Sequence, residues 1–126
     1  LLENEIDNAL PSIQFETPKF IYLSRGDKEP IEIAEKELSM LKTFAGRLST
    51  IKNVYVKEQI NNDEDHQSNS MISIINGLKF IFDGYITSKP YRDCTMNELE
   101  EHYISLSEKY GYEMPIPERI KKQVKK

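Results

Sequence analysis

The sequence predicts an α/β domain with a small three-stranded sheet flanked by a cluster of five or so helices. Alternating apolar residues at 19–24 and 52–57 are typical of strands. Apolar residues at helical spacing predict helices over 35–48, 71–83 and 96–110. These segments follow one another in the order strand, strand, helices, strand, polar loop, apolar helix and capped helix, which places the chain in the α/β class.

The first half of the chain opens with a stretch, 1–12, whose apolar residues share one side of a short helix that Pro11 ends. The strand Lys19–Ser24 then runs into the charged turn RGDKEP, where Gly26 can take a positive φ. Residues 31–34 make either a short returning strand or a first helical turn. Gly46 is a point at which the following helix can divide. The polar stretch 61–70 reads as a mobile loop.

The stretch IINGLKFIFDGYIT admits two interpretations. Asn76-Gly77 and Asp83-Gly84 are dipeptides favoured in hairpin turns, and they would make 78–82 the middle strand of a meander. The apolar residues, however, fall at helical spacing: Met71, Ile74, Ile75, Leu78, Ile81, Phe82 and Tyr85. A meander would be apolar on both faces, at about 1.5–3 kcal/mol for each large side chain left in water. Glycine inside a helix costs only about 1 kcal/mol.

We therefore predict a helix over 71–83 that ends at Gly84. Its apolar stripe is expected to be buried against the C-terminal helix, with only Ile72 and Phe80 on the other side.

The C-terminal helix has the clearest signals in the sequence. Thr95 and Glu98 form a capping box, in which each side chain bonds the backbone amide of the other residue. Gly111 stands where a left-handed C-cap is expected. Pro117 is placed to start a further short helix. The apolar residues of the main helix follow at spacings of three and four: Met96, Leu99, Tyr103, Leu106 and Tyr110.

Composition limits the classes of function. Of 126 residues 30% are charged and the net charge is −4, which indicates a soluble acidic domain and disfavours a general polyanion binder. The single cysteine, Cys94, excludes an internal disulfide and fits a reducing compartment. No apolar run approaches a membrane span, so a cytoplasmic or nuclear protein without membrane contact is expected. The sequence opens on Leu1 instead of Met, which indicates a piece of a longer protein.

Four segments together resemble the BTB/POZ superfamily, in particular its elongin C and Skp-adaptor branch. KFIYLSRGDKEPIEIAEKELSMLKTFAGRLS resembles the opening of that fold, and NVYVKE its third strand. LKFIFDGYI is similar to a helix end in the family, and TMNELEEHYISLSEKYGYEMP to the helix after it. The likeness covers 19–114, so 1–18 is expected to be an extension and 115–126 a basic helix or tail. The loop at 61–70 is longer than is usual in the family, and its Ala-His-Lys motif is absent.

The resemblance implies a non-enzymatic protein–protein interaction domain, acting as an adaptor or dimerisation module. Such a domain joins a client protein to a cullin-type ubiquitin ligase or another large complex. Its partner is then a protein, in a homodimer or a hetero-complex. The predicted partner-binding residues are Phe20, Tyr22, Lys57, Tyr103, Leu106, Tyr110, Tyr112 and Met114.

We predict no catalytic, cofactor-binding or metal-binding residues. The stretch Asp63–His66 is interpreted as a solvated loop, because four successive side chains converge on a metal only at a large ordering cost. The alternative function is a regulator that binds nucleic acid through its basic C-terminal helix. The basic residues of that helix are Arg119, Lys121, Lys122, Lys125 and Lys126.

Overall fold

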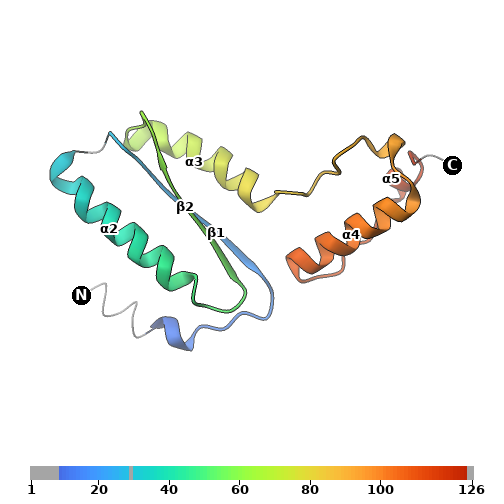
Figure 1. The fold of residues 1–126 in the computed structure, drawn as a ribbon, viewed down its shortest axis with the longest axis horizontal. Coiled ribbons are helices and arrows are strands. Elements are labelled where there is room, and N and C mark those ends of the chain that lie inside the picture. The colour runs from blue at the N-terminus through green and yellow to red at the C-terminus, as the bar shows by residue number, and fades with distance from the viewer. Residues whose placement is uncertain (1–8, 29, 125–126) are drawn as a thin grey trace. The chain divides into compact units, whose positions relative to one another are not determined.

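The structure is a computed structural model, and it describes residues 9–28 and 30–124. The chain forms two compact units, Leu1–Ile81 and Phe82–Lys126 (Figure 1). The first unit contains η1 (Leu10–Ser12), β1 (Lys19–Gly26), α2 (Ile31–Leu48), β2 (Val54–Asn61) and α3 (His66–Ile81). The second contains η2 (Tyr91–Asp93), α4 (Met96–Tyr110) and α5 (Glu118–Lys121). Most of the helix predicted within 1–12 lies outside the described residues.

The two strands are parallel. Their register runs from Lys19 opposite Val54 to Gly26 opposite Asn61. Just outside these ends, the Lys19 N–H donates to the Asn53 carbonyl at 2.7 Å and the Asp27 N–H donates to the Asn61 carbonyl at 3.1 Å. Parallel neighbours need a crossover, which α2 supplies. Both strands therefore end at the same edge of the sheet.

The predicted three-stranded sheet is wrong. Residues 31–34 form the first turn of α2 and do not return as a strand, so the described residues hold two strands. Gly46 does not divide α2, which runs unbroken for 18 residues. The described residues form four α-helices, where five or so were expected. The α/β class itself is confirmed.

The core of the first unit lies where α2 meets β2. Leu48, Ile51 and Val54 are buried there. In Figure 1, α2 and α3 flank the strand pair on opposite sides, which gives three layers. The half-buried residues that complete this core come from several elements: Leu10, Ile13, Phe15, Ile21, Leu23, Phe44 and Val56.

The helix predicted over 71–83 is confirmed, since α3 spans His66–Ile81. Within the first unit, α3 packs on β1 with a side other than the predicted apolar stripe. The helix packs on β1 through small residues: Gly77 is buried against the Tyr22 ring, and the hydroxyls of Ser73 and Ser24 bond to each other. A Cβ on Gly77 would lie 3.4 Å from Tyr22 Cδ1, which is an ordinary van der Waals contact, so the helix packs closely on this ring.

The expected apolar stripe of α3 is exposed. Met71 is 71% exposed and Ile74 64%, with Ile75 and Leu78 at about half. Phe80, which the sequence placed off the buried side, packs edge-on against Phe20 at 6.1 Å. The helix thus reaches the sheet through Ser73, Gly77 and Phe80. Among the described residues, no helix is both long and apolar enough to cross a membrane.

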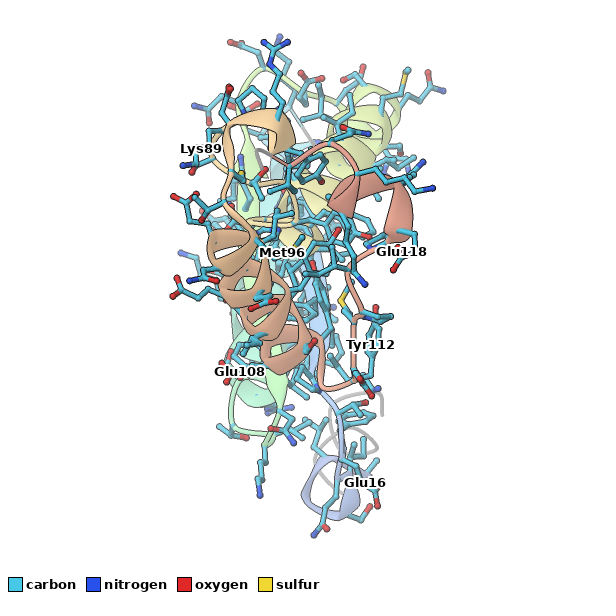
Figure 2. All side chains as sticks on the ribbon, turned by 90° about the vertical axis from the view of Figure 1, so that its right-hand side faces the viewer. Glu16, Lys89, Met96, Glu108, Tyr112 and Glu118 are labelled. Atoms are coloured by element: carbon cyan, nitrogen blue, oxygen red, sulfur yellow. The ribbon has the colours of Figure 1, made fainter. Side chains whose placement is uncertain are left out.

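The second unit is built around α4. The capping box is present: the Glu98 N–H donates to Thr95 Oγ1 at 3.2 Å and the Thr95 N–H to Glu98 Oε2 at 2.7 Å. Gly111 ends the helix with φ 73°. Figure 2 shows Met96 at the start of α4 and Tyr112 beyond its end. A small core of Cys94, Leu99 and Ile120 holds α5 to it.

Candidate functional site

Two turns interlock at the carboxyl ends of the strands. The Lys28 N–H donates to the Glu64 carbonyl at 3.0 Å, next to the bond from Asp27 to Asn61. A Cβ on Gly26 would lie 2.0 Å from the Glu64 carbonyl oxygen, where no side chain fits. Glycine at position 26 therefore allows the turn after β1 to close against the loop after β2.

The loop after β2 is held from within. Asn61 is 5% exposed, and its Nδ2 donates to Asn69 Oδ1 at 2.7 Å. Asp63 takes the left-handed conformation with φ 65°. Its carboxylate lies 3.4 Å from Lys28 Nζ. The stretch predicted as a ten-residue mobile loop is thus a short connection, because β2 continues to Asn61 and α3 begins at His66.

Asp65 caps α3 and fixes where it starts. Its Oδ1 accepts from the N–H groups of Gln67 and Ser68, both at 2.9 Å, and its own N–H donates to Ser68 Oγ at 3.0 Å. The Ser68 and Gln67 amides hold the pKa of Asp65 below its ordinary value. The carboxylate is therefore engaged by the helix end. Among the described residues, no three His, Cys, Asp or Glu side chains group to hold a metal ion.

His66 is the first residue of α3, directly after this cap, and it is exposed. It lies at the carboxyl end of the strand pair, where Asp27 is the first residue after β1. In parallel α/β sheets, ligands bind outside the carboxyl ends of the strands. An imidazole and a carboxylate at this edge are groups that can move and stabilise a proton. We therefore take Asp27 and His66 as the candidate site.

The chain's other histidine has a different setting. His102 lies within α4, with its Nε2 3.1 Å from the Tyr85 carbonyl oxygen. Its ring meets that of Tyr103 edge-on at 5.5 Å. This ring helps to fasten the segment before α4 to the helix.

The predicted partner-binding residues fall into two groups, one in each unit. In the first unit, Phe20 stacks on Tyr55 at 5.3 Å and the Tyr22 hydroxyl donates to Gln59 Oε1 at 3.2 Å. Lys57 is exposed on β2. No finding tests the role of these residues, which stays a prediction.

In the second unit, Leu106 is buried and Tyr103 and Met114 are half-buried. Tyr110 is half-buried and Tyr112 is 58% exposed, with their rings 6.3 Å apart. Burial raises the pKa of the Tyr103 and Tyr110 hydroxyls above the ordinary value. Tyr112 is the member of this group that offers the most surface to a partner, and that role also stays a prediction.

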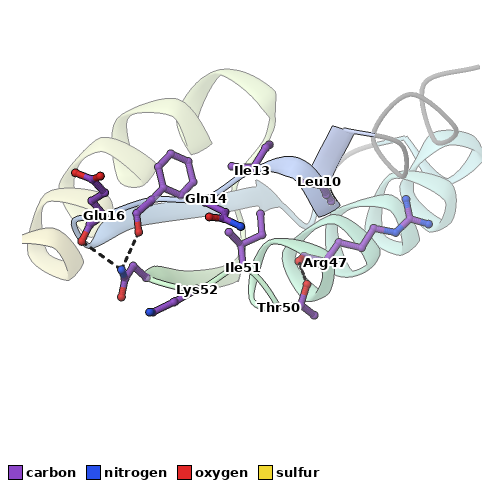
Figure 3. Close-up of a pocket in the computed structure, with 10 residues that line it drawn as sticks. Leu10, Ile13, Gln14, Glu16, Arg47, Thr50, Ile51 and Lys52 are labelled. Carbon is purple, nitrogen blue, oxygen red and sulfur yellow. Dashed lines mark hydrogen bonds between the residues drawn. The ribbon is translucent and has the colours of Figure 1, made fainter.

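A large open cavity lies at the opposite end of the strands (Figure 3). It has a volume of about 970 Å³ and lies between η1 and the connection from α2 to β2. Asn53 Nδ2 crosses from that connection to the Phe15 carbonyl at 2.8 Å. Because this cavity borders the amino ends of the strands, it is not part of the edge that holds His66.

Comparison with known proteins identifies the fold. No family model matches the chain, and no curated protein matches it either. The chain is similar in structure to the crystal structure of an IroE-like serine hydrolase from Shewanella oneidensis, with a TM-score of 0.70 and 18% sequence identity. The match covers 97% of this chain and 39% of that protein. The fold of the chain thus resembles part of an α/β hydrolase.

This match corrects the family prediction. The fold is not that of the BTB/POZ superfamily or its elongin C and Skp-adaptor branch. The strands are parallel and joined by α2, whereas the BTB interpretation needed a return strand at 31–34. The degenerate apolar patterns that carried the resemblance fit both folds.

The function predictions are corrected with it. The non-enzymatic adaptor in a ubiquitin ligase complex rested on the BTB fold, and the matched fold is that of a serine hydrolase. The nucleic-acid-binding alternative required a basic C-terminal helix that contacts the nucleic acid. Within the described residues α5 spans Glu118–Lys121, and its Lys121 pairs with Glu118 at 2.6 Å. Lys125 and Lys126 of that prediction lie outside the described residues.

Sequence reasoning missed His66 as a candidate. The signal available was a histidine between the end of a strand and an apolar helix, preceded by a strand that ends in Gly26-Asp27. It was overlooked because the polar stretch was interpreted as a solvated loop.

Proposed function

We propose that this chain is the part of an α/β serine hydrolase that supplies the catalytic histidine, His66, and its acidic partner. In such hydrolases the triad residues follow in the order serine, acid, histidine. The chain contains no G-x-S-x-G motif, so the serine would come from a segment outside these 126 residues. The fold likeness to a serine hydrolase over 97% of the chain supports this proposal.

His66 would act as the general base. Its imidazole would accept the proton of the serine hydroxyl as that oxygen attacks an ester carbonyl, and would return the proton to the leaving alcohol. Its place at the carboxyl edge supports the role, because catalytic residues of α/β enzymes gather there. His102, bonded within the second unit, has no such place.

The acid would come from the turn after β1. Asp27 follows the strand directly, and Glu29 follows two positions later in the sequence, outside the described residues. A carboxylate from this turn would accept the other imidazole N–H and hold the ring in orientation. Asp65 is less suited, because two backbone amides already occupy its Oδ1.

One observation carries the proposal: the turn at Gly26–Lys28 closes against the loop that leads to His66. Its evidence is the 3.0 Å bond from Lys28 to Glu64 and the lack of room for a side chain on Gly26. This contact brings an acidic turn and a histidine to the same end of the sheet. The acid also precedes the histidine in the sequence, as in the triad order of such hydrolases.

Hydrolysis of a short-chain nitrophenyl ester tests the proposal, measured on the natural polypeptide that contains these residues. We expect His66→Ala to lower kcat/KM by about 10³-fold or more, because the serine loses its base. The matched control is His102→Ala, which is expected to keep kcat/KM near that of the parent. Equal rates for His66→Ala and the parent would refute the proposal.

The acid is assigned by a second pair of variants, Asp27→Asn and Glu29→Gln. The one that removes the orienting carboxylate is expected to lower kcat by about 10²–10⁴-fold, while the other retains activity. If neither variant lowers kcat, the turn after β1 does not supply the acid.

A further inference from the structure

The second unit carries a row of aromatic rings outside its core, and we call Phe82, Tyr85, Tyr110 and Tyr112 the aromatic row. The ring centroids of Phe82 and Tyr85 lie 5.6 Å apart. The Tyr110 centroid lies 6.4 Å from that of Tyr85 and 6.3 Å from that of Tyr112. Phe82, Tyr85 and Tyr112 are 50%, 42% and 58% exposed, and Tyr110 is half-buried. Exposed aromatic rings in mutual contact are typical of binding surfaces.

Charged groups already lie around Tyr110, within the aromatic row. Lys109 Nζ is 5.5 Å from the centroid of the Tyr110 ring and donates to the Asp83 carbonyl oxygen. A ring face attracts a cation because the electron cloud on that face is negative. Burial raises the pKa of the Tyr110 hydroxyl, and the neighbouring Tyr112 and Tyr85 hydroxyls and the Asp83 carboxylate raise it further. The row thus holds one cation of the chain itself and has a carboxylate beside it.

The wider surroundings of the aromatic row are acidic. Residues 82–114 contain seven acidic and three basic side chains. Among the acidic ones, Asp83 and Glu113 are exposed, and they stand two positions before Tyr85 and one position after Tyr112. A guanidinium group stacks on an aromatic face and also pairs with a carboxylate through its planar fork, which the compact ammonium of lysine does less well. The charges and the rings together therefore favour arginine as the side chain that this surface binds.

The spacing of the rings fits the side chains of an extended peptide. In an extended chain, residues two positions apart project to the same side and lie about 6.6 Å apart. Neighbouring rings of the aromatic row have centroids 5.6 to 6.4 Å apart. A peptide with arginine at alternate positions therefore carries successive guanidinium groups at close to the spacing of successive rings.

We propose that the aromatic row is a docking surface for an extended segment of a partner protein that carries arginine at alternate positions. Its guanidinium groups stack on the exposed rings of Tyr85 and Tyr112 and pair with the carboxylates of Asp83 and Glu113. All of these residues belong to the second unit, so the inference does not rest on the hydrolase proposal. It gives a partner of defined chemistry to Tyr112, which was predicted only to bind a protein.

Fluorescence anisotropy with a synthetic peptide tests the docking surface. The probe is a fluorescein-labelled peptide in which arginine and serine alternate and arginine occurs three times. In the matched control peptide, citrulline replaces every arginine, which keeps the shape of the side chain and removes its charge. Both peptides are titrated with the natural polypeptide that contains these 126 residues. We expect the arginine peptide to bind at least about tenfold more tightly, because citrulline lacks the attraction to ring faces and carboxylates.

Variants of the protein assign that binding to the aromatic row. Tyr112→Ala is expected to weaken binding of the arginine peptide by about three- to tenfold, because it removes a ring face. Tyr112→Phe keeps the ring and should bind the peptide like the parent. Tyr55→Ala is the matched control, because Tyr55 is a tyrosine of the first unit that is 52% exposed, and its removal should leave binding unchanged.

Several results would overturn the proposal. Equal affinity for the arginine and citrulline peptides would show that charge plays no part in binding. Equal loss of affinity in Tyr112→Phe and Tyr112→Ala would show that the hydroxyl makes the contact, as expected for a bound sugar. Unchanged affinity in Tyr112→Ala would place the peptide elsewhere on the acidic surface.

Other occupants of the aromatic row give different results, which also overturn the proposal. Free argininamide that binds as tightly as the arginine peptide would show a site for a small molecule. Failure of the natural polypeptide to bind the peptide at micromolar concentrations would show that the row is covered by another part of the protein or by a second copy. None of these measurements uses ester hydrolysis, so their outcome is independent of the test of His66.

Discussion

α3 and α4 are helices of 16 and 15 residues, and both carry apolar residues at spacings of three and four. α4 buries its stripe, with Leu99 at 0% and Leu106 at 3% exposure. α3 leaves the equivalent residues Met71 and Ile74 outside. The same pattern therefore predicts a helix correctly in both places, but the stripe it predicts to be buried is buried in α4 and exposed in α3.

The difference lies in what each helix packs against. α4 has a partner within its own unit, since α5 and the segment around Cys94 close over Leu99. α3 approaches β1 at Ser73, whose hydroxyl bonds that of Ser24, and at Gly77, whose backbone lies against Tyr22. A periodic stripe shows which residues can be buried, but the partner decides which of them are.

The largest expected difference between the two helices comes from truncating one leucine in each. Leu99→Ala is expected to lower the free energy of unfolding of the second unit by about 2–5 kcal/mol, because it leaves a cavity in a small core. Leu78→Ala, on the exposed stripe, is expected to change the free energy of unfolding of the first unit by only about 0.5 kcal/mol. Urea unfolding of the 126-residue chain measures both. A Leu78→Ala loss as large as that of Leu99→Ala would contradict the exposed stripe.

Substitution of two glycines tests the contact between the turn after β1 and the loop after β2. Gly26→Ala is expected to destabilise the first unit by about 1–3 kcal/mol, because its Cβ would lie 2.0 Å from the Glu64 carbonyl oxygen. Gly46→Ala is the control: no atom lies within 4 Å of its Cβ, and alanine in a helix should add about 1 kcal/mol. Thermal unfolding should move in opposite directions for the two. A neutral Gly26→Ala would contradict the interlocked turns.

A smaller effect is expected at the α4 cap. Thr95→Ala removes the acceptor for the Glu98 N–H and should cost about 1 kcal/mol. Thr43→Ala, an exposed position within α2, is the control and should be neutral or slightly stabilising. Urea midpoints report both changes. Equal midpoints for Thr95→Ala and the parent would argue against the cap.

The smallest effect is a dependence of stability on pH. Bonds from Lys89 Nζ and the Thr95 N–H lower the pKa of Glu98 from its ordinary 4.5 to about 2. Because the folded pKa lies below the unfolded one, this stabilisation is present above pH 4.5 and is lost as the pH falls toward 2. Glu98→Gln should flatten that part of the stability curve in an acid titration. An unchanged curve would exclude this carboxylate as its cause.

The sequence allows local structure to be predicted where the signals are local. The capping box at Thr95 and the C-cap at Gly111 were predicted correctly, since each depends on residues within one turn of the helix. The α3 helix was also predicted, against two dipeptides typical of hairpins. Helical spacing of the apolar residues from Met71 to Tyr85 outweighs the Asn76-Gly77 and Asp83-Gly84 dipeptides, and Gly77 packs on Tyr22.

The pairing of the strands could not be predicted in the same way. Whether 31–34 returns as a strand or begins a helix is decided by long-range contacts, and the sequence left both open. With the helix, the strands become parallel and their carboxyl ends meet. Only with this pairing do Asp27 and His66, which are 39 positions apart in the sequence, lie at the same end of the strand pair. The site depends on this pairing, which the sequence did not predict, and His66 itself lay in a stretch interpreted as a solvated loop.

The parallel pairing of β1 and β2 is the central claim, and scalar couplings across hydrogen bonds in an NMR experiment test it most directly. We predict couplings from the Lys19 N–H to the Asn53 carbonyl and from the Asp27 N–H to the Asn61 carbonyl. A coupling that joins the Lys19 region to Asn61, or β1 to residues 31–34, would show antiparallel pairing. That result would separate Asp27 from His66 and remove the candidate site.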